Sequence, residues 1–267
     1  MFIFGAIKFT SPQPIQVGVD YDYYHLTTDQ IEADLSTLKE IGVTSLRIQY
    51  HSDIPDKTLQ FLQATAGLEV MLMTPTYVDS TFESYLSSYS QYIHVYQLSN
   101  ELDRVHTTIP DYNQPLTYKE LESIVTSLIS AIDHYDSDYE TVATFSQAYE
   151  TRVDLLALGG TKTGIGAICS HVDYVGYDVY LSEGLTVLPY GVNLLKSLSQ
   201  KPMWITEVGA TTSNEVEQSN YIISVLDFAK RNNIGKVFIF NYNRGWLDYS
   251  IQGTLAEQKL AEWIKNN

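Results

Sequence analysis

Residues 203–209 have the sequence Met-Trp-Ile-Thr-Glu-Val-Gly, a short apolar run that ends around the carboxylate of Glu207. A run this short, with apolar residues on both faces, is typical of a buried strand in a parallel sheet. Residues 96–101, Tyr-Gln-Leu-Ser-Asn-Glu, place Glu101 in the same position after another such run. Desolvating a carboxylate costs several kcal/mol unless the group is paired or used. The two glutamates therefore predict a functional site at strand ends.

Outward from these two runs, the chain alternates a predicted strand with a predicted helix eight times. The expected strands cover residues 16–19, 43–49, 68–73, 93–98, 141–145, 172–179, 202–206 and 236–240. The expected helices cover residues 28–41, 56–66, 80–90, 117–134, 150–158, 189–198, 214–232 and 254–265. Thr27 or Thr28 caps the first helix and Gly42 ends it. Thr117 and Glu120 form a capping box at the start of the fourth helix.

Short apolar strands that are each followed by a helix indicate a parallel sheet covered by helices. Eight such units in 267 residues favour a closed (β/α)8 TIM barrel over a doubly wound open sheet. No shift in composition and no linker divides the chain. Residues 1–267 are therefore predicted to form a single α/β domain, one (β/α)8 barrel.

Composition excludes several classes of protein. The formal net charge of −16 argues against binding to nucleic acid, which requires clustered Lys and Arg, and against anionic membranes. No apolar run approaches the ~18 residues of a membrane span. Cys169 is the single cysteine, so no intrachain disulfide can form. The apolar start, residues 1–8, lacks a basic leader, and a cytoplasmic protein is the default expectation. Nothing in the sequence indicates an oligomeric state.

In a (β/α)8 barrel the catalytic groups gather at the carboxyl ends of the strands. The side chains predicted at those ends are acids, one arginine, amides and aromatics: Asp20, Tyr21, Arg47, Gln49, Tyr77, Asn100, Glu101, Gln147, Asp178, Tyr180, Glu207, Asn241, Tyr242 and Trp246. Amides and carboxylates hydrogen-bond hydroxyl groups, and aromatic rings stack on the C–H faces of sugars. The set therefore predicts a site for a carbohydrate.

The pair of glutamates suggests a reaction. Hydrolysis of a glycosidic bond requires one carboxyl group that protonates the leaving oxygen and a second that attacks or stabilises the sugar. Carboxyl groups ~5 Å apart favour a covalent intermediate and retention, whereas a gap of ~6.5–9.5 Å admits a water and gives inversion.

Four short motifs resemble the retaining β-glycosidases of glycoside hydrolase clan A, which are barrels with catalytic glutamates after strands four and seven. The motifs are Ser99-Asn100-Glu101, Trp204-Ile205-Thr206-Glu207, Ser45-Leu46-Arg47-Ile48 and Gly176-Tyr177-Asp178-Val179-Tyr180. The resemblance implies a retaining glycoside hydrolase that cleaves β-linked glycosides or polysaccharides without a cofactor.

The same resemblance implies a role for individual residues. Glu101 would be the general acid/base and Glu207 the nucleophile. Arg47 would lie beside Glu207 and keep it ionised, and Tyr180 would donate a hydrogen bond to the same carboxylate. Asn100 would hold the 2-hydroxyl of the sugar.

The chain also departs from the family pattern. Leu102 stands where a proline commonly follows Asn-Glu, and Phe240-Asn241-Tyr242 occupies the end of strand eight, where a tryptophan is common. Asn241, Tyr242 and the later Trp246 are the candidate sugar-binding residues there. These departures leave open a catalytically silent carbohydrate-binding barrel. A phosphate-binding lyase or isomerase is a third possibility, but neither a glycine-rich phosphate loop nor a Schiff-base lysine is visible at a strand end.

Two further patterns are assigned no chemistry. Asp20, Asp22, His25, His51 and Asp53 do not have the spacing of a hydrolytic metal site, and we interpret them as a polar subsite or solvated loops. No metal is predicted. Residues 159–164, Gly-Gly-Thr-Lys-Thr-Gly, lack the Gly-Lys-Ser/Thr order of a phosphate loop and are expected to be a flexible connection.

Overall fold

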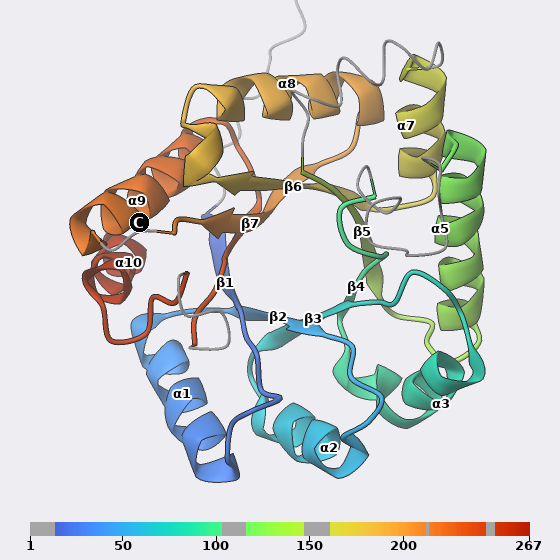
Figure 1. Ribbon diagram of the computed structural model, residues 1–267, viewed down its shortest axis with the longest axis horizontal. Coiled ribbons are helices and arrows are strands. Elements are labelled where there is room, and N and C mark those ends of the chain that lie inside the picture. The colour runs from blue at the N-terminus through green and yellow to red at the C-terminus, as the bar shows by residue number, and fades with distance from the viewer. Residues whose placement is uncertain (1–13, 103–115, 147–160, 212–213, 244–248) are drawn as a thin grey trace, which may run out of the picture.

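The computed structural model describes residues 14–102, 116–146, 161–211, 214–243 and 249–267. Its eight strands are all parallel and form a closed barrel in the order β1 to β8, with β8 hydrogen-bonded to β1. Helices surround the barrel on the outside (Figure 1). The prediction of a (β/α)8 TIM barrel is confirmed.

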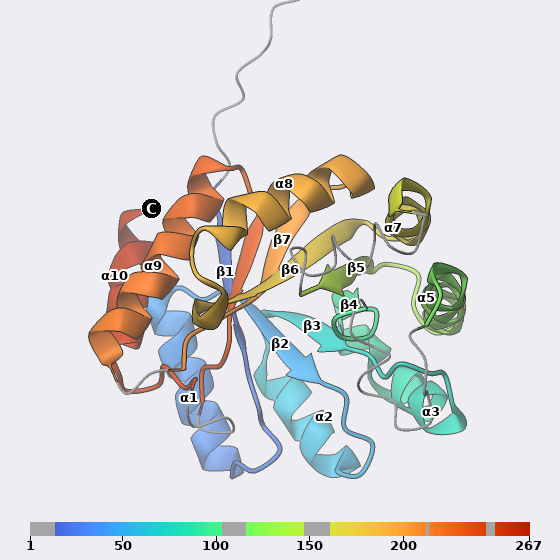
Figure 2. The ribbon, with the colours of Figure 1, turned by 45° about the horizontal axis from the view of Figure 1, so that its top comes forward.

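The strands lie close to their predicted ranges. They are β1 Gln16–Asp20, β2 Ser45–Gln49, β3 Glu69–Met73, β4 Val95–Gln97, β5 Glu140–Phe145, β6 Tyr174–Tyr180, β7 Met203–Gly209 and β8 Lys236–Ile239. Figure 2 shows them side by side at the centre of the molecule, with the helices outside.

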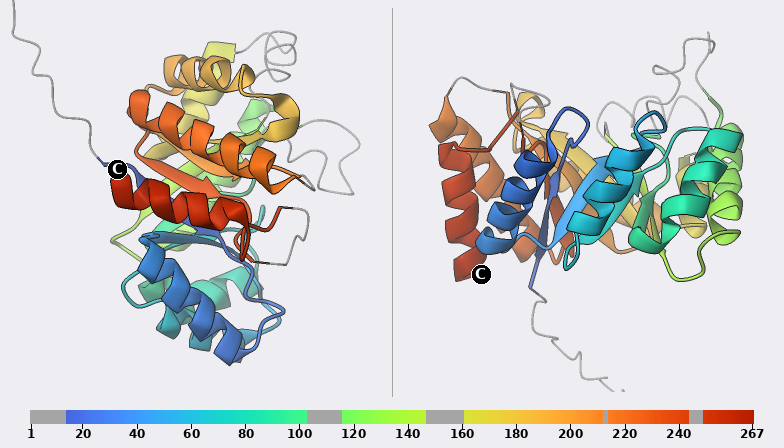
Figure 3. Two further views of the ribbon diagram at one scale, coloured as in Figure 1. Left: turned by 90° about the vertical axis from the view of Figure 1, so that its left-hand side faces the viewer. Right: turned by 90° about the horizontal axis from the view of Figure 1, so that it is seen from below.

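The helices form the outer layer. They are α1 Thr28–Ile41, α2 Pro55–Ala64, α3 Ser80–Tyr89, α5 Tyr118–Asp133, α7 Thr161–Ser170, α8 Val187–Ser199, α9 Glu215–Arg231 and α10 Leu255–Asn266, with short 3-10 turns η1 Ser90–Tyr92 and η2 Leu181–Glu183. Helix α10 lies between α1 and α9 and so closes the ring (Figure 3). None of the helices in the described ranges is long and apolar enough to cross a membrane.

Local sequence signals explain where the helices begin and end. Thr27 caps α1 and Thr117 caps α5, each in a capping box with the residue three positions later. Helix α1 ends at Gly42, whose φ of 90° is a left-handed conformation that glycine adopts without strain. These caps were predicted from the sequence and are present.

The segment around Gly164 differs from its prediction. A flexible connection was expected over residues 159–164, but helix α7 begins at Thr161. A Cβ at Gly164 would lie 2.4 Å from the ring of Tyr118, so the missing side chain lets α7 pack closely against α5. This close packing outweighs the low helix propensity of glycine. The helix predicted over residues 150–158 lies outside the described residues.

The inside of the barrel has an apolar lower part and a polar upper part. Below the carboxyl ends of the strands, five buried side chains pack together: Met71, Val95, Val142, Trp204 and Phe238. Nearer the carboxyl ends lie buried polar residues: Arg47, Gln97, Thr144, Asp178, Thr206 and Glu207. Because the apolar part closes the barrel from below, the polar groups face the carboxyl end, where barrel enzymes place their sites.

Strand β7 carries an irregularity at the point where these polar side chains begin. Its pairing with β6 changes register after Tyr177, and Asp178 pairs with Glu207 rather than with Thr206. Its pairing with β8 also shifts between Ile205 and Val208. A bulge of this kind re-aims side chains. Here it brings Thr206 and Glu207, two consecutive residues of β7, to Asp178 and Arg47 respectively.

Candidate active site

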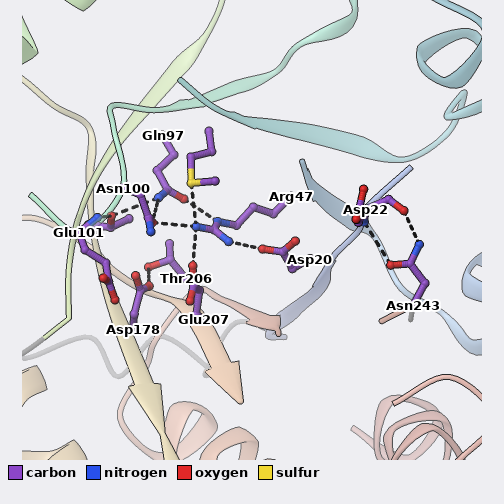
Figure 4. Close-up of polar contacts among 12 residues, drawn as sticks. Asp20, Asp22, Arg47, Gln97, Asn100, Glu101, Asp178, Thr206, Glu207 and Asn243 are labelled. Atoms are coloured by element: carbon purple, nitrogen blue, oxygen red, sulfur yellow. Dashed lines mark hydrogen bonds and ion pairs between the residues drawn. The ribbon is translucent and has the colours of Figure 1, made fainter. Parts of the chain in front are cut away.

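The side chain of Arg47 on β2 is the centre of the polar contacts inside the barrel (Figure 4). It is 1% exposed. Its Nε donates to Gln97 Oε1 at 2.6 Å, and its Nη2 lies 2.6 Å from Glu207 Oε1 and 3.0 Å from Asn100 Oδ1. Its Nη1 donates to the carboxylate of Asp20. One guanidinium therefore joins residues from β1, β4 and β7 and from the loop after β4.

The carboxylate of Glu207 on β7 is held from two sides. Arg47 contacts Oε1, and the hydroxyl of Tyr180 at the end of β6 donates to Oε2. Burial and the negative charge of Glu207 raise the pKa of Tyr180 above its usual range, so this tyrosine keeps its proton to donate. Two donors on different oxygens fix the orientation of the carboxylate.

Glu101 is presented by a strained turn after β4. Ser99 and Glu101 both have positive φ, of 65° and 44°, which residues with a side chain rarely adopt. Two threonines hold the turn: Thr74 Oγ1 accepts from the amide of Ser99 at 2.9 Å, and Thr144 Oγ1 accepts from the amide of Glu101 at 3.0 Å. Strain of this kind persists where the surroundings over-determine it, often at functional sites.

Asn100 directly precedes Glu101 in sequence and lies beside Arg47 in space. Its Oδ1 accepts from Arg47 and, at 2.8 Å, from Gln97 Nε2. With the oxygen occupied by two donors, the orientation of the amide group is defined, and its NH₂ group is the part that can donate to another molecule.

The two glutamates meet at the carboxyl end of the barrel together with a third carboxylate, Asp178. One carboxylate oxygen from each of Glu101, Asp178 and Glu207 lies within 4.8 Å of one oxygen of each of the others. Glu101 is half-buried, whereas Asp178 and Glu207 are buried. We call these three residues the carboxylate cluster. Sequence reasoning placed Asp178 at a strand end without assigning it a role.

The side chain of the fully buried Asp178 makes one hydrogen bond among the described residues. Its Oδ1 accepts from Thr206 Oγ1 at 2.6 Å, and its Oδ2 has no partner there. Burial and, after it, the charge of Glu207 raise the pKa of Asp178 well above its usual range. A single aspartate within an otherwise apolar strand was the sequence signal for this group.

Asp20 on β1 is the second buried acid with a raised pKa. Burial outweighs its contact with Arg47 and raises the pKa of Asp20 to about 7. In the sequence it was grouped with Asp22, His25, His51 and Asp53, but its partner is Arg47 inside the barrel, so it belongs to the buried network rather than to a solvated loop.

Because Asp20 and Asp178 have raised pKa values, we expect the protein to become less stable as the pH rises. The folded chain keeps both protons in a range where the unfolded chain has lost them, and proton binding by the folded state favours folding. For each of the two groups, the free energy of unfolding falls by up to about 1.4 kcal/mol per pH unit above about pH 4. For Asp20 this fall ends near pH 7. Urea unfolding at pH 5 and pH 8 measures the change, and greater stability at pH 8 would contradict it.

The candidate residues after β8 lie in different places. Asn241 is fully buried, and neither polar atom of its side chain has a partner among the described residues. The buried Tyr242 stacks against Tyr21 with ring centroids 6.3 Å apart and donates its hydroxyl to Glu257 on α10 at 2.8 Å. It packs between the barrel and α10. Trp246 lies outside the described residues.

Aromatic rings that were not assigned a role stand near Glu207. Phe240 and Tyr249 are half-buried, with ring centroids 5.3 Å apart, and both meet the ring of Tyr180 edge-on. Phe240 occupies the end of β8 where the resemblance leads one to expect a tryptophan. Tyr249 comes from the loop after β8, a position that strand periodicity does not mark.

The other residues of the acidic and histidine group lie around Tyr24 in the loops after β1 and β2. The Tyr24 hydroxyl donates to Asp53 at 2.6 Å, and the rings of His25 and His51 each lie 4.8 Å from its ring. Asp22 accepts from the amide of Tyr24 at 2.8 Å. These contacts are those of polar, partly exposed loops, in agreement with the interpretation from the sequence.

The carboxylate cluster has the oxygen ligands that a divalent cation prefers. However, the Arg47 guanidinium already contacts Glu207 and places a positive charge against one of the three ligands. The repulsion between this charge and a metal cation disfavours metal binding. The three carboxylates are therefore better suited to hold protons than to hold a metal ion.

Fold and site together define a TIM barrel with one glutamate after β4 and a second on β7, close to each other at the carboxyl end. The fold matches that of clan A glycoside hydrolases at low sequence identity, which confirms the resemblance for the barrel. The sequence itself matches no family model and no curated protein.

Three solved structures illustrate the match. The endo-1,4-β-mannanase from Rhizomucor miehei has a TM-score of 0.70 and 12% identity over 97% of each chain. The endo-β-1,4-mannanase from Thermotoga petrophila has a TM-score of 0.68 and 13% identity over 95% of this chain and 77% of its own. A GH5_18 protein from Streptomyces cattleya, in complex with GlcNAc, has a TM-score of 0.67 and 14% identity over 96% and 81%. At these identities the likeness is one of fold.

Proposed function

We propose that this chain is a retaining β-glycosidase in which Glu207 is the nucleophile and Glu101 the general acid/base. The observation that carries the proposal is the close approach of the two carboxylates, since one oxygen of Glu101 lies within 4.8 Å of one oxygen of Glu207 at the carboxyl end of the barrel. Such a separation is near the ~5 Å of retaining enzymes and too short for the intervening water of inverting ones.

The surroundings of the two acids support different roles for them. Glu207 is buried and held by Arg47 and Tyr180 in one orientation, as a nucleophile needs to be. Glu101 is half-buried on its turn, and a neutral acid there can reach a glycosidic oxygen that enters from solvent. The NH₂ group of Asn100 is proposed to donate to the sugar 2-hydroxyl.

The reaction has two steps. In the first, a Glu207 oxygen bonds to the anomeric carbon, the bond to the leaving group breaks with its electron pair on oxygen, and that oxygen takes the Glu101 proton. In the second, water attacks the anomeric carbon, gives a proton to Glu101 and releases Glu207 as a carboxylate. Two inversions give overall retention.

The proposed substrate class is supported by acidic, amide and aromatic side chains of the kinds that bind sugars and by the folds of the matched structures. Since two of these structures are mannanases, β-1,4-mannan and manno-oligosaccharides are the first substrates to test, followed by β-glucans. Phe240, Tyr249 and Tyr180 are proposed to form an aromatic wall beside the sugar.

Covalent trapping tests the proposal. The protein is incubated with 2-deoxy-2-fluoro β-glycosyl fluorides of the manno and gluco series, and intact mass and peptide mapping are recorded. We expect one glycosyl adduct, on Glu207, that forms more slowly when the matching oligosaccharide is added. Binding of oligosaccharides without any adduct or hydrolysis would favour the catalytically silent barrel instead, and an adduct on another residue would overturn the assignment.

A further inference from the structure

The third member of the carboxylate cluster has no role in the reaction described above. Asp178 lies on β6 directly opposite Glu207 in the strand pairing, and its side chain is fully buried. It is therefore fixed between the two proposed catalytic glutamates by the barrel itself rather than by a loop.

The hydrogen bonds of Asp178 leave one oxygen available inside the cluster. The hydroxyl of Thr206 donates to Oδ1, while Oδ2 has no partner among the residues that the structure describes. Gly176 makes room for this arrangement, since a Cβ there would lie 2.4 Å from Thr206 Oγ1. A fully buried carboxyl oxygen without a donor is costly if it carries charge.

The charges that face Asp178 in the described structure do not balance if it is ionised. Arg47 supplies one positive charge, which already faces Glu207 and, above about pH 7, the ionised Asp20 as well. Glu101 and Tyr180 also face the group and add no positive charge. An ionised Asp178 would be a further buried anion without a cation of its own, whereas a neutral one turns Oδ2 into a hydrogen-bond donor among acceptors.

We propose that Asp178 is a positioning residue that works as a neutral carboxylic acid and donates its Oδ2 proton, directly or through one water, to whichever of Glu207 and Glu101 is the anion. This proposal rests on the proposed function and deepens it.

The two-step reaction gives this donor a reason to lie between the glutamates. Before the first step Glu207 is the carboxylate and Glu101 holds a proton. After the step Glu207 is an uncharged ester and Glu101 is the carboxylate. The negative charge therefore moves across the cluster, and a neutral donor within 4.8 Å of both acids can turn to it in each state. The proton of Asp178 stays on Asp178 throughout.

The raised pKa of Asp178 agrees with this reading, because burial and the charges of Glu207 and Glu101 all oppose its ionisation. The positive charge of Arg47 and the hydrogen bond from Thr206 lower the pKa of Asp178, but together they are weaker than the influences that raise it.

Two substitutions distinguish a role of Asp178 as a neutral hydrogen-bond donor from a role as a negative charge. Asp178→Asn keeps an oxygen for Thr206 and an NH₂ group in place of Oδ2–H, so we expect kcat to stay within about tenfold of the unchanged protein. Asp178→Val removes the donor from a strand where valine fits, and we expect kcat to fall by about 10²–10³-fold with little change in KM. Equal losses in both variants, with thermal unfolding unchanged, would overturn the proposal.

Infrared spectroscopy tests the proton without relying on activity. At pH 8.5, where Asp20 is ionised, the spectrum of the unchanged protein minus that of Asp178→Asn is expected to show the C=O stretch of a protonated carboxyl group, above the amide I band. A difference spectrum without this band would overturn the proposal even if trapping confirms the glycosidase. Tight binding of Mg²⁺ or Mn²⁺ that Asp178→Asn abolishes would also overturn it. If trapping fails but the band is present, the proposed function fails and the proton on Asp178 stands.

Discussion

Replacing Glu207 by Ala is expected to lower kcat/KM for an aryl β-glycoside by about 10⁵-fold or more, as removal of a nucleophile does in other enzymes that form covalent intermediates. No neighbouring group replaces it, because Asp178 is neutral in our proposal and Asp20 lies beyond Arg47. Steady-state rates on a substrate with a good leaving group measure the loss. The matched control is Glu262→Ala, since Glu262 is exposed on α10 and pairs with Lys259 at the surface.

Azide distinguishes the two glutamates by the stereochemistry of the product. In Glu207→Ala the anion fits the vacated space and attacks from the side of the missing nucleophile, which gives an α-glycosyl azide. In Glu101→Ala it attacks the glycosyl-enzyme from the side of the missing acid/base, which gives a β-glycosyl azide. NMR of the isolated products identifies the anomers. The opposite pairing would exchange the two roles, and unchanged turnover in either variant would remove that residue from the mechanism.

Replacing Arg47 by Met is the second large effect, on stability as well as activity. Arg47 is 1% exposed and contacts the carboxylates of Asp20 and Glu207. Without it, two buried carboxylates lose their cation, and breaking a buried pair typically costs about 3–5 kcal/mol. Hydrolysis should be lost too, because Glu207 is no longer held as an oriented anion. Urea unfolding and the aryl glycoside assay measure the two losses.

A combined variant isolates the cause of that instability. Adding Asp20→Asn and Glu207→Gln to Arg47→Met removes the uncompensated charges, so most of the lost free energy of unfolding should return while hydrolysis stays absent. Lys259→Met, which breaks an exposed pair, should change stability by less than about 1 kcal/mol. If the combined variant is as unstable as Arg47→Met alone, lost packing rather than unpaired charge explains the result.

The barrel could be predicted because its signals are local. Apolar runs, the capping boxes at Thr27 and Thr117 and the glycine that ends α1 each act within a few residues. Helix α7 was missed because its support is not local: Gly164 permits close packing on Tyr118, which lies far away in sequence. The propensity of a glycine-rich segment contains no information about that neighbour.

The candidate site was predictable to the extent that it lies on strands. Position along a strand identifies which end of the barrel a side chain occupies, which brought Glu101, Glu207 and Arg47 into one prediction. It does not tell which way a residue points once the strand has ended, as with Tyr242, whose hydroxyl reaches Glu257. The position of a residue along a strand also does not reveal how the buried positive and negative charges inside the barrel balance. The protonated state proposed for Asp178 could therefore not be predicted from the sequence.

The left-handed backbone conformation of Glu101 lowers the stability of the fold, whereas its side chain is needed for the proposed reaction. A residue with a side chain at a φ of 44° costs free energy that glycine would not, so a chain with glycine at position 101 would fold more favourably and lose its acid. Ser99, with a φ of 65°, is in the same situation. Descendants of this protein in which the proposed reaction was no longer used would be expected to accumulate glycine or asparagine at these two positions first. Under the proposed function, the glutamate at position 101 is kept for its carboxyl group at the expense of folding free energy.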